Sequence, residues 1–173
     1  MGVIFMNFQS TGKLIAVADK YIKCDNYTVK TEGHKNYRGI DYTADFVEII
    51  NVPNNSVSFE VTENEIIIFF FSDHVHFSDY ELEVEKGAPD YVDRAVEFLE
   101  KLFTLPIERE YTVKGDKVVR DESFFIISKS EKESCAGVWL SFAGIRNLFK
   151  KKKRIVEVKN FDTTIGNFIT FIE

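Results

Sequence analysis

The feature that most constrains the fold is a run of six consecutive apolar residues, Ile66 to Phe71, near the middle of the chain. Such a run is typical of a β-strand that is buried on both faces, because β-branched and aromatic side chains favour strands. Before it, Val57, Phe59 and Val61 alternate with polar residues, which predicts a strand with one wet face. A turn at Glu63-Asn64 joins the two segments. The sequence therefore predicts a hairpin whose second strand lies in the centre of a sheet.

The composition supports a sheet-rich globular protein. Seventeen phenylalanines and seven tyrosines are unusually many for 173 residues, and aromatic side chains favour strands and large buried contacts. With 45% hydrophobic residues, 29% charged residues and three prolines, the chain resembles folded domains in composition and not disordered ones. Because a domain commonly contains about 100–200 residues, we expect a single domain over residues 1–173.

The first of two predicted helices covers residues 10–22. Leu14 and Ala18 belong to an apolar stripe at steps of three and four, which is the spacing of one helix face. Ser10 or Thr11 can cap its N-terminus through a side-chain oxygen. We expect the apolar face to pack on the sheet.

The second predicted helix covers residues 89–104. Pro89 suits the first helical position, and Asp90 complements the positive end of the helix dipole. The expected buried stripe consists of Val92, Ala95, Val96, Leu99, Leu102 and Phe103.

Hairpins dominate the rest of the chain. Further strands are expected at residues 26–31, 40–52, 107–113, 118–128, 135–140, 154–161 and 167–172, with an irregularity near Ala44-Asp45. Gly115 is the first central residue of a predicted type II′ turn. Polar loops are expected at residues 32–36 and 129–134, and a short third helix at residues 141–151. This order predicts an α+β fold with a largely antiparallel sheet and two main helices packed on it.

Two of the three histidines, His74 and His76, follow the central strand. If that strand continues past Phe71, residues 70, 72, 74 and 76 point to one face, and the imidazoles lie side by side as a pair of ligands would. With Glu81 they have the spacing His-x-His-x4-Glu. This segment resembles the first motif of the cupin family, in which two histidines and a glutamate bind a metal. The resemblance implies that His74, His76 and Glu81 are ligands of a divalent transition metal.

The sequence departs from that motif at two points. Ile68 stands where the family has a glycine, and no histidine follows His76 to supply the ligand of the second motif. The alternative for the pair is structural: one imidazole bonds a backbone group or a carboxylate at the end of the strand, and the other is partly solvated. We interpret His34, which lies in a polar segment, as a surface residue.

An acidic segment follows the central strand. Residues 73–100 hold nine carboxylates and two basic residues, a local charge of −7 in a chain whose formal charge is −6. Such a surface attracts a basic protein partner and disfavours nucleic acid, whereas its simpler interpretation is solubility. The predicted partner-binding residues are Asp73, Asp79, Tyr80, Glu81, Glu83 and Glu85.

Other chemistry receives little support from the sequence. Cys24 and Cys135 lie far apart without a CxxC partner, and no nucleophile elbow or phosphate loop occurs. We interpret the basic run Lys150 to Arg154 as a solvated turn, with contact to phosphate or anionic lipid as the alternative. The start of the chain, Met1 to Met6, lacks the features of a signal peptide, and no segment reaches the about 18 apolar residues of a membrane span. We expect a cytoplasmic protein with reduced thiols, which does not contact membranes.

A second resemblance concerns residues 56–119. The block EIIIFFFSDHVHFSDY, the helix DYVDRAVEFLEKLF and the hairpin IEREYTVKGDKVV are together similar to a pattern in small bacterial proteins of the toxin-immunity type. The resemblance implies a cytoplasmic α+β inhibitor that binds and blocks a toxin, and nuclease toxins tend to be basic. We therefore predict a non-enzymatic binding protein without a cofactor. The alternatives are a metal-binding protein or metal-dependent enzyme that uses His74 and His76, and a small-molecule pocket beneath the sheet.

Overall fold

The computed structural model confirms an α+β fold with antiparallel sheets and two main helices. It describes residues 8–22, 27–37, 40–49, 57–71, 73–78, 89–136, 139–141, 150–162 and 167–171. The chain divides into two compact units, Met1–Phe103 with Asp162–Asn167, and Thr104–Phe161 with Phe168–Glu173. That the chain folds as one cooperative domain stays a prediction, because contacts within each unit do not show whether both unfold together.

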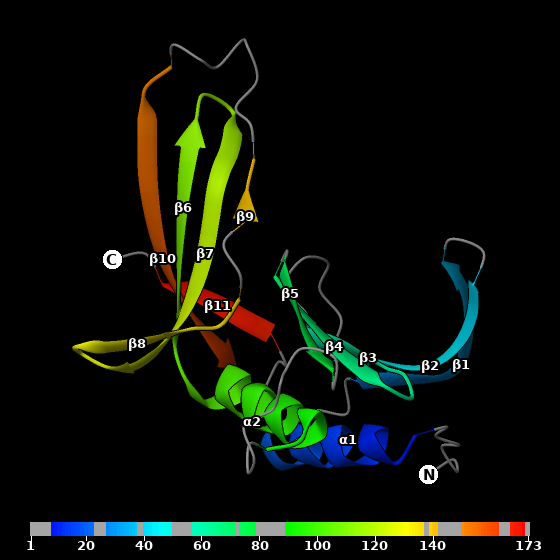
Figure 1. Cartoon of the computed structure of the whole chain (residues 1–173). Helices are drawn as coiled ribbons and strands as arrows, with labels where there is room; N and C mark the ends of the chain where they lie inside the picture. Colours follow the sequence, from blue (N-terminus) through cyan, green and yellow to red (C-terminus); the bar gives the residue numbers. More distant parts are fainter. Residues whose placement is uncertain are drawn as a thin grey trace. The chain divides into compact units, whose positions relative to one another are not determined.

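The first unit contains a five-stranded antiparallel sheet in which sequence neighbours are also neighbours in space (Figure 1). This order follows from hairpin connections, which join antiparallel strands over a few residues. Its strands are β1 (Tyr27–Tyr37), β2 (Ile40–Ile49), β3 (Val57–Val61), β4 (Glu65–Phe70) and β5 (Asp73–Ser78). The helices α1 (Gln9–Tyr21) and α2 (Tyr91–Thr104) lie on one face of the sheet. No described helix is long and apolar enough to cross a membrane.

The core of this unit lies between the sheet and α2. On β4, Ile66, Ile68 and Phe70 are fully buried. The ring of Phe98, which the expected stripe omitted, lies 5.6 Å from the ring of Phe70 and 5.4 Å from that of Phe77. Burying one such side chain stabilises a fold by about 1.5–3 kcal/mol, so this aromatic cluster is a main source of the unit's stability.

The opposite face of β4 differs from the expectation. Ile67 is half-buried and Phe69 is 36% exposed, so the prediction that both faces of this strand are fully buried is wrong. The strand still lies between β3 and β5, as predicted. Runs of apolar residues therefore need not mean two covered faces, because aromatic side chains also favour strands that are covered on one face only.

Helix α1 is capped from the sheet and not by its own side chains. Phe8 occupies the N-cap position without a side-chain cap, so the predicted cap at Ser10 or Thr11 is wrong. The buried carboxylate of Asp45 on β2 accepts hydrogen bonds from Phe8 N (3.1 Å) and Thr11 Oγ1 (2.6 Å). The predicted irregularity near Asp45 is confirmed as a bulge, with one extra residue in β1 between Lys30 and Gly33.

The two helices run side by side and parallel. Lys13 pairs with Asp93 at 3.5 Å near the start of both helices, and Lys20 pairs with Glu100 at 3.0 Å near the end of both. Asp90 is the N-cap of α2, because its carboxylate accepts a hydrogen bond of 2.7 Å from Asp93 N. Pro89 therefore precedes the helix, and its predicted place at the first helical position is wrong.

The second unit contains the other sheet, in the order β11-β10-β6-β7-β8, with β9 also paired to β7 (Figure 1). Its strands are β6 (Ile107–Lys114), β7 (Lys117–Ser128), β8 (Glu131–Ser134), β9 (Trp139–Leu140), β10 (Lys152–Asp162) and β11 (Asn167–Phe171). Gly115 has φ 71° in the β6–β7 turn, where the predicted type II′ geometry requires a positive φ.

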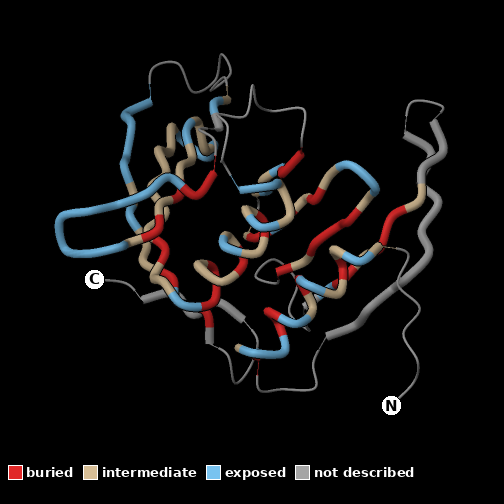
Figure 2. The backbone as a smooth tube through the Cα atoms, turned by 60° about the horizontal axis from the view of Figure 1, so that its bottom comes forward, coloured by how far each residue is buried: buried red, intermediate tan, exposed pale blue. Residues whose placement is uncertain are grey.

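Both predicted polar loops are strands. β1 continues through residues 32–36, and β8 covers residues 131–134. The reason is that both are edge strands, where polar and charged residues are common because they discourage pairing with other chains. Figure 2 shows the exposed β7–β8 hairpin, residues 127–134, in pale blue. The core of the predicted third helix, residues 142–149, lies outside the described residues.

Candidate functional site

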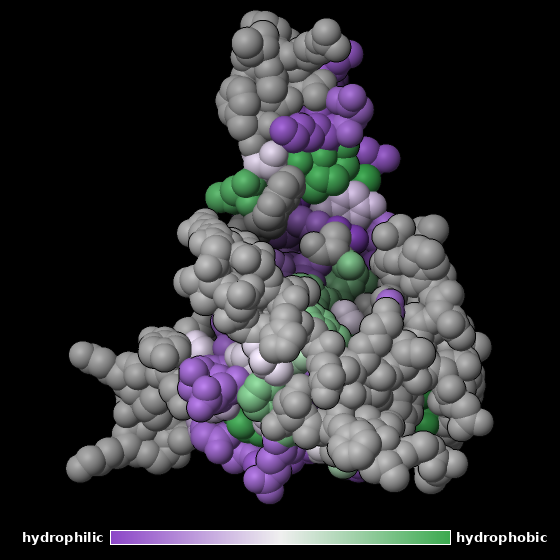
Figure 3. All heavy atoms as spheres, turned by 90° about the vertical axis from the view of Figure 1, so that its right-hand side faces the viewer, coloured by the Kyte–Doolittle hydropathy of each residue, from purple (hydrophilic) through white to green (hydrophobic). Residues whose placement is uncertain are grey.

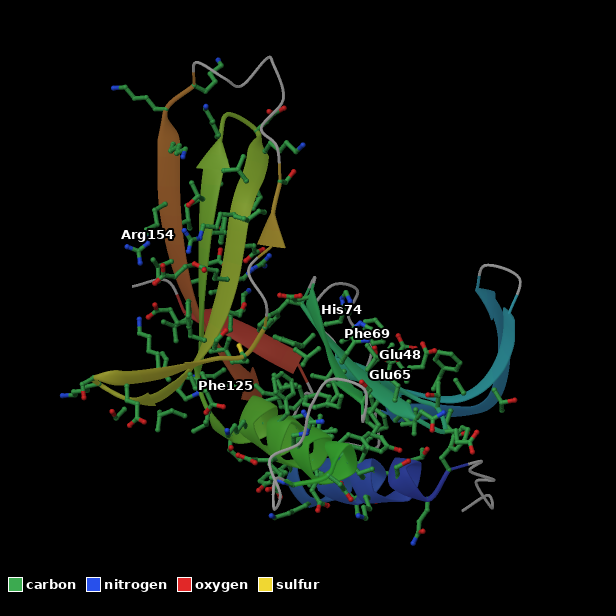
Figure 4. All side chains as sticks on the ribbon, in the orientation of Figure 1. Glu48, Glu65, Phe69, His74, Phe125 and Arg154 are labelled. Atoms are coloured by element: carbon green, nitrogen blue, oxygen red, sulfur yellow. The ribbon has the colours of Figure 1, made fainter. Side chains whose placement is uncertain are left out.

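The candidate site lies on the outer face of the five-stranded sheet. We define this as the face opposite to the one that carries Ile66, Ile68 and Phe70. Residues paired directly across antiparallel strands have side chains on the same face, so the register defines two transverse rows. The first row runs from β2 to β5 and consists of Glu48, Ser58, Phe69 and His74. The second row, beside it, consists of Phe46, Glu60, Ile67 and His76. In Figure 4, the labelled Glu48, Glu65, Phe69 and His74 lie on the side of the sheet away from the helices.

A hollow opens on the outer face where the row contains its smallest residue. Ser58 lies between Glu48 and Phe69 in the first row, and its short side chain leaves room between these larger neighbours. The hollow has a volume of about 210 Å³. Its lining consists of Phe46, Val47, Glu48, Ser58, Phe59 and Phe69. The hollow therefore combines aromatic walls with one carboxylate.

Between β2 and β5, the charged residues of the outer face include several carboxylates. Glu48 is exposed and makes no hydrogen bond or ion pair with any part of the chain that the structure describes. The neighbouring row adds Glu60, which is 4% exposed, and β4 adds Glu65. From β2 to β5, neither row contains a lysine or an arginine, whereas the register continues the second row to Lys30 on β1, opposite Phe46. The part of the outer face between β2 and β5 therefore favours cations.

The two histidines lie side by side at the β5 edge of this face. Their ring centroids are 4.9 Å apart at an interplanar angle of 67°, and both side chains are exposed, which confirms the predicted pairing of the imidazoles. The strand does not continue past Phe71, however. Phe71 has φ 54° in a tight turn, and β5 returns antiparallel to β4. His74 and His76 therefore lie opposite Phe69 and Ile67, and the prediction that they share a face with residue 70 is wrong.

His76 has a carboxylate partner that the sequence did not indicate. Its Nδ1 lies 2.7 Å from Oε1 of Glu65, and the ring of His74 lies 5.7 Å from that of Phe69. This matches the structural interpretation of the pair, in which one imidazole bonds a carboxylate. Glu65 pairs with Ser78 and so lies diagonally across from His76. Only the register of the β4–β5 hairpin could have identified it.

The metal site implied by the cupin resemblance is not assembled from the described residues. Glu81, its third ligand, lies outside them, and within the described ranges no three histidine, cysteine or acidic side chains form a group that could hold a metal ion. The structure brings together His74, His76 and Glu65 instead, with the carboxylate bonded to an imidazole.

Of the predicted partner-binding residues, only Asp73 is described. It begins β5, and its Oδ1 accepts a hydrogen bond of 2.9 Å from His74 N. The remaining five, Asp79, Tyr80, Glu81, Glu83 and Glu85, lie outside the described residues.

The acidic side chains of α2 are neutralised within the protein. Asp93 and Glu100 pair with lysines of α1, and Glu97 pairs with Lys101 at 2.9 Å. The charge of −7 counted along residues 73–100 therefore overstates the negative electrostatic potential of this region, because lysines of α1, outside that segment, pair with two of its carboxylates. On the face drawn in Figure 3, the described hydrophobic side chains appear as small green areas, some of them next to hydrophilic side chains in purple.

The sheet of the second unit carries paired charges on both faces. On one face, Arg109 forms a two-pronged ion pair with Asp121, and Tyr111 donates a hydrogen bond of 2.8 Å to Glu157. The hydrogen bond to Asp121 raises the pKa of Arg109, against the effect of burial, and that to Glu157 raises the pKa of Tyr111. On the other face, the ion pairs are Lys132–Glu108, Arg154–Glu110 and Arg120–Glu122. These groups satisfy one another, so we assign them a structural role.

Two further sequence interpretations can be compared with this unit. Cys135, the expected start of a strand at residues 135–140, lies outside the strands, because β9 covers only Trp139–Leu140. Its side chain is buried, and its N–H donates to Ser123 O at 2.9 Å. The basic run is only partly a solvated turn: Lys150 and Lys151 precede the strand and are exposed, whereas Lys152 to Arg154 begin β10. Arg154, labelled in Figure 4, is held by Glu110.

Comparison with protein-family models, with curated proteins and with solved structures gave no match for this chain. The resemblances to the cupin motif and to toxin-immunity proteins therefore rest on the sequence segments that suggested them.

Proposed function

We propose that this chain is a non-enzymatic, cytoplasmic binding protein of the bacterial immunity type, which binds a basic protein partner. Its binding surface comprises the outer face of the five-stranded sheet and the acidic segment at residues 73–85, and it uses no cofactor. The observation that carries the proposal is the exposed carboxylate of Glu48, which has no partner among the described residues, beside the partly exposed ring of Phe69.

The contrast between the two sheets supports this choice. In the second unit, the carboxylates of Glu108, Glu110 and Glu122 each face a lysine or arginine of a described strand. On the outer face, Glu48 has no such partner among the described residues. A carboxylate beside an exposed aromatic ring is typical of protein interfaces, where aromatic side chains are enriched.

Charge reversal tests the proposal. A partner is first captured from the native host, and its affinity is then measured for the wild type and for a variant with Glu81→Lys, Glu83→Lys and Glu85→Lys. We expect the affinity to fall by about tenfold or more and its dependence on salt to weaken. The matched control reverses three exposed carboxylates elsewhere, Glu63, Asp116 and Glu131. An affinity and a salt dependence that stay unchanged in the first variant would contradict the assigned surface.

A metal-binding function is the second candidate, and the side-by-side imidazoles of His74 and His76 favour it. The carboxylate of Glu65 orients His76 as carboxylates commonly orient metal-binding histidines. Elemental analysis of protein purified without chelator distinguishes the two candidates. A stoichiometric divalent metal that is lost in His74→Ala supports the second candidate, and metal-free protein contradicts it.

A further inference from the structure

We infer that the hollow over Ser58 binds a lysine or arginine side chain of the partner, held between the rings of Phe46 and Phe69 with its charge at Glu48. The inference rests on the proposed function and names the chemistry that the partner must present. It follows from the size of the hollow, the nature of its walls and the sign of its charge.

The spacing of the strands fits one side chain. Phe46 lies on β2 and Phe69 on β4, on either side of the strand that carries Ser58. The two strands are roughly 9.5 Å apart, two strand spacings, and the two residues face each other diagonally across Ser58, because Phe46 pairs with Glu60 in the neighbouring row. An alkyl stem in contact with both walls needs roughly 7–8 Å, twice the usual carbon–carbon contact distance. The volume of about 210 Å³ also leaves room for a single extended stem between the two rings.

The lining selects the chemistry of the occupant. Lysine and arginine bury their alkyl stems against apolar surface and keep the charged head at a polar rim, and aromatic rings attract a nearby cation. Here the rim supplies the carboxylate of Glu48. An apolar occupant would take water from Glu48 without replacing its interactions, and an anion would be repelled by the carboxylate of Glu48. A cation with an apolar stem satisfies every group of the lining.

The test uses a blocked hexa-arginine peptide as the probe and hexa-citrulline as its neutral control of the same shape. Titration of the full-length ¹⁵N-labelled protein is followed by amide resonances. We expect hexa-arginine to shift the resonances of Glu48, Ser58 and Phe69, and to bind at least about tenfold more tightly than hexa-citrulline.

Three variants separate the hollow from general attraction between opposite charges. Glu48→Gln removes the charge at the rim, and Ser58→Leu fills the hollow without changing any charge. We expect each to weaken hexa-arginine binding by about tenfold, whereas Glu131→Gln, on the exposed edge strand β8, leaves it unchanged. Far-UV circular dichroism and thermal unfolding of each variant verify that it is folded.

Two outcomes with these three variants would overturn the inference. If Ser58→Leu binds the peptide as the wild type does, or if Glu131→Gln weakens binding as much as Glu48→Gln, the attraction does not involve the hollow. A fourth variant, Lys30→Met, removes the lysine that β1 places opposite Phe46 in the register. If this variant binds hexa-arginine more tightly than the wild type does, the hollow accepts cations. If its binding is unchanged and the resonances of Glu48, Ser58 and Phe69 are unaffected by the peptide, the inference is contradicted. The proposed function fails separately, when reversal of Glu81, Glu83 and Glu85 leaves the affinity for the captured partner unchanged.

Discussion

At the scale of single residues, Asp45 joins helix α1 to the sheet. Its carboxylate is fully buried, a costly place for a charge unless hydrogen bonds satisfy it. It accepts bonds from the backbone of Phe8 and the hydroxyl of Thr11, at the helix end where the dipole is positive. A side chain that would be unfavourable alone thus becomes the cap of a helix 34 residues earlier in the chain.

We predict that Asp45→Ala lowers the free energy of unfolding by about 2–4 kcal/mol, because it removes a cap and leaves two donors unsatisfied. Thr11→Val, which removes only the hydroxyl, should cost about 1 kcal/mol. Chemical denaturation measures both values. Asp93→Ala serves as the control, since its ion pair with Lys13 is solvent-exposed and contributes at most about 0.5 kcal/mol. Equal losses in Asp45→Ala and Asp93→Ala would contradict the role of Asp45.

The pair formed by Glu110 and Arg154 predicts a dependence of stability on pH. The hydrogen bond from Arg154 holds the pKa of Glu110 below its usual range. A carboxyl group whose pKa is lower in the folded state stabilises the fold above its ordinary pKa, about 4.3, and this contribution is lost as the pH falls through the folded value. We expect Glu110→Gln to flatten the acid side of the curve of stability against pH between about pH 5 and 3. High salt should reduce the difference in stability between the wild type and Glu110→Gln, because Arg154 is largely exposed and its attraction to Glu110 is screened.

At the scale of elements, the two faces of strand β4 have different roles: one face stabilises the core, and the other lines the hollow. Phe70 faces the core and contacts Phe98, whereas the next residue back, Phe69, lines the hollow on the outer face. Alternation of side chains between the two faces of a strand places these identical residues in opposite environments.

We predict that Phe70→Ala lowers the free energy of unfolding by about 3–5 kcal/mol through loss of buried contacts. Phe69→Ala should cost less than about 1 kcal/mol, because its side chain is partly exposed, yet it should weaken binding of a basic partner or peptide. Denaturation curves and peptide titrations of the same two proteins provide both measurements. A large stability loss in Phe69→Ala would indicate that the outer face is part of the core and not a binding surface.

At the scale of the whole molecule, the chain passes between its two compact units more than once. It leaves the first unit after Phe103, returns at Asp162 and leaves again after Asn167. Three crossings tie the units together covalently, which favours one cooperative transition over two independent ones.

We therefore predict that both units unfold in one transition. Both described helices lie largely in the first unit, so circular dichroism at 222 nm follows that unit, whereas the single tryptophan, Trp139, reports on the second. The two probes should give coincident denaturation curves. Separate midpoints would show two domains and contradict the single domain expected from the length of the chain.

The sequence by itself determined the local elements: helix α2, the β3–β4 hairpin, and the β6–β7 turn with Gly115. These features depend on residues that are close neighbours in the chain, so spacing and turn chemistry suffice to predict them. The same reasoning failed for the edge strands, whose polar residues are those that loops also prefer.

Only the tertiary structure decided which residues meet across the chain. The chain turns at Phe71, so that the two histidines lie on the outer face, and His76 contacts Glu65. Asp45 lies against the start of α1. The tertiary structure also placed Ser58 between two larger neighbours, which creates the hollow. Each of these contacts depends on strand register and on packing between distant segments. A shift of register by one residue would move every side chain of a strand to the other face, and the local sequence alone does not determine that register.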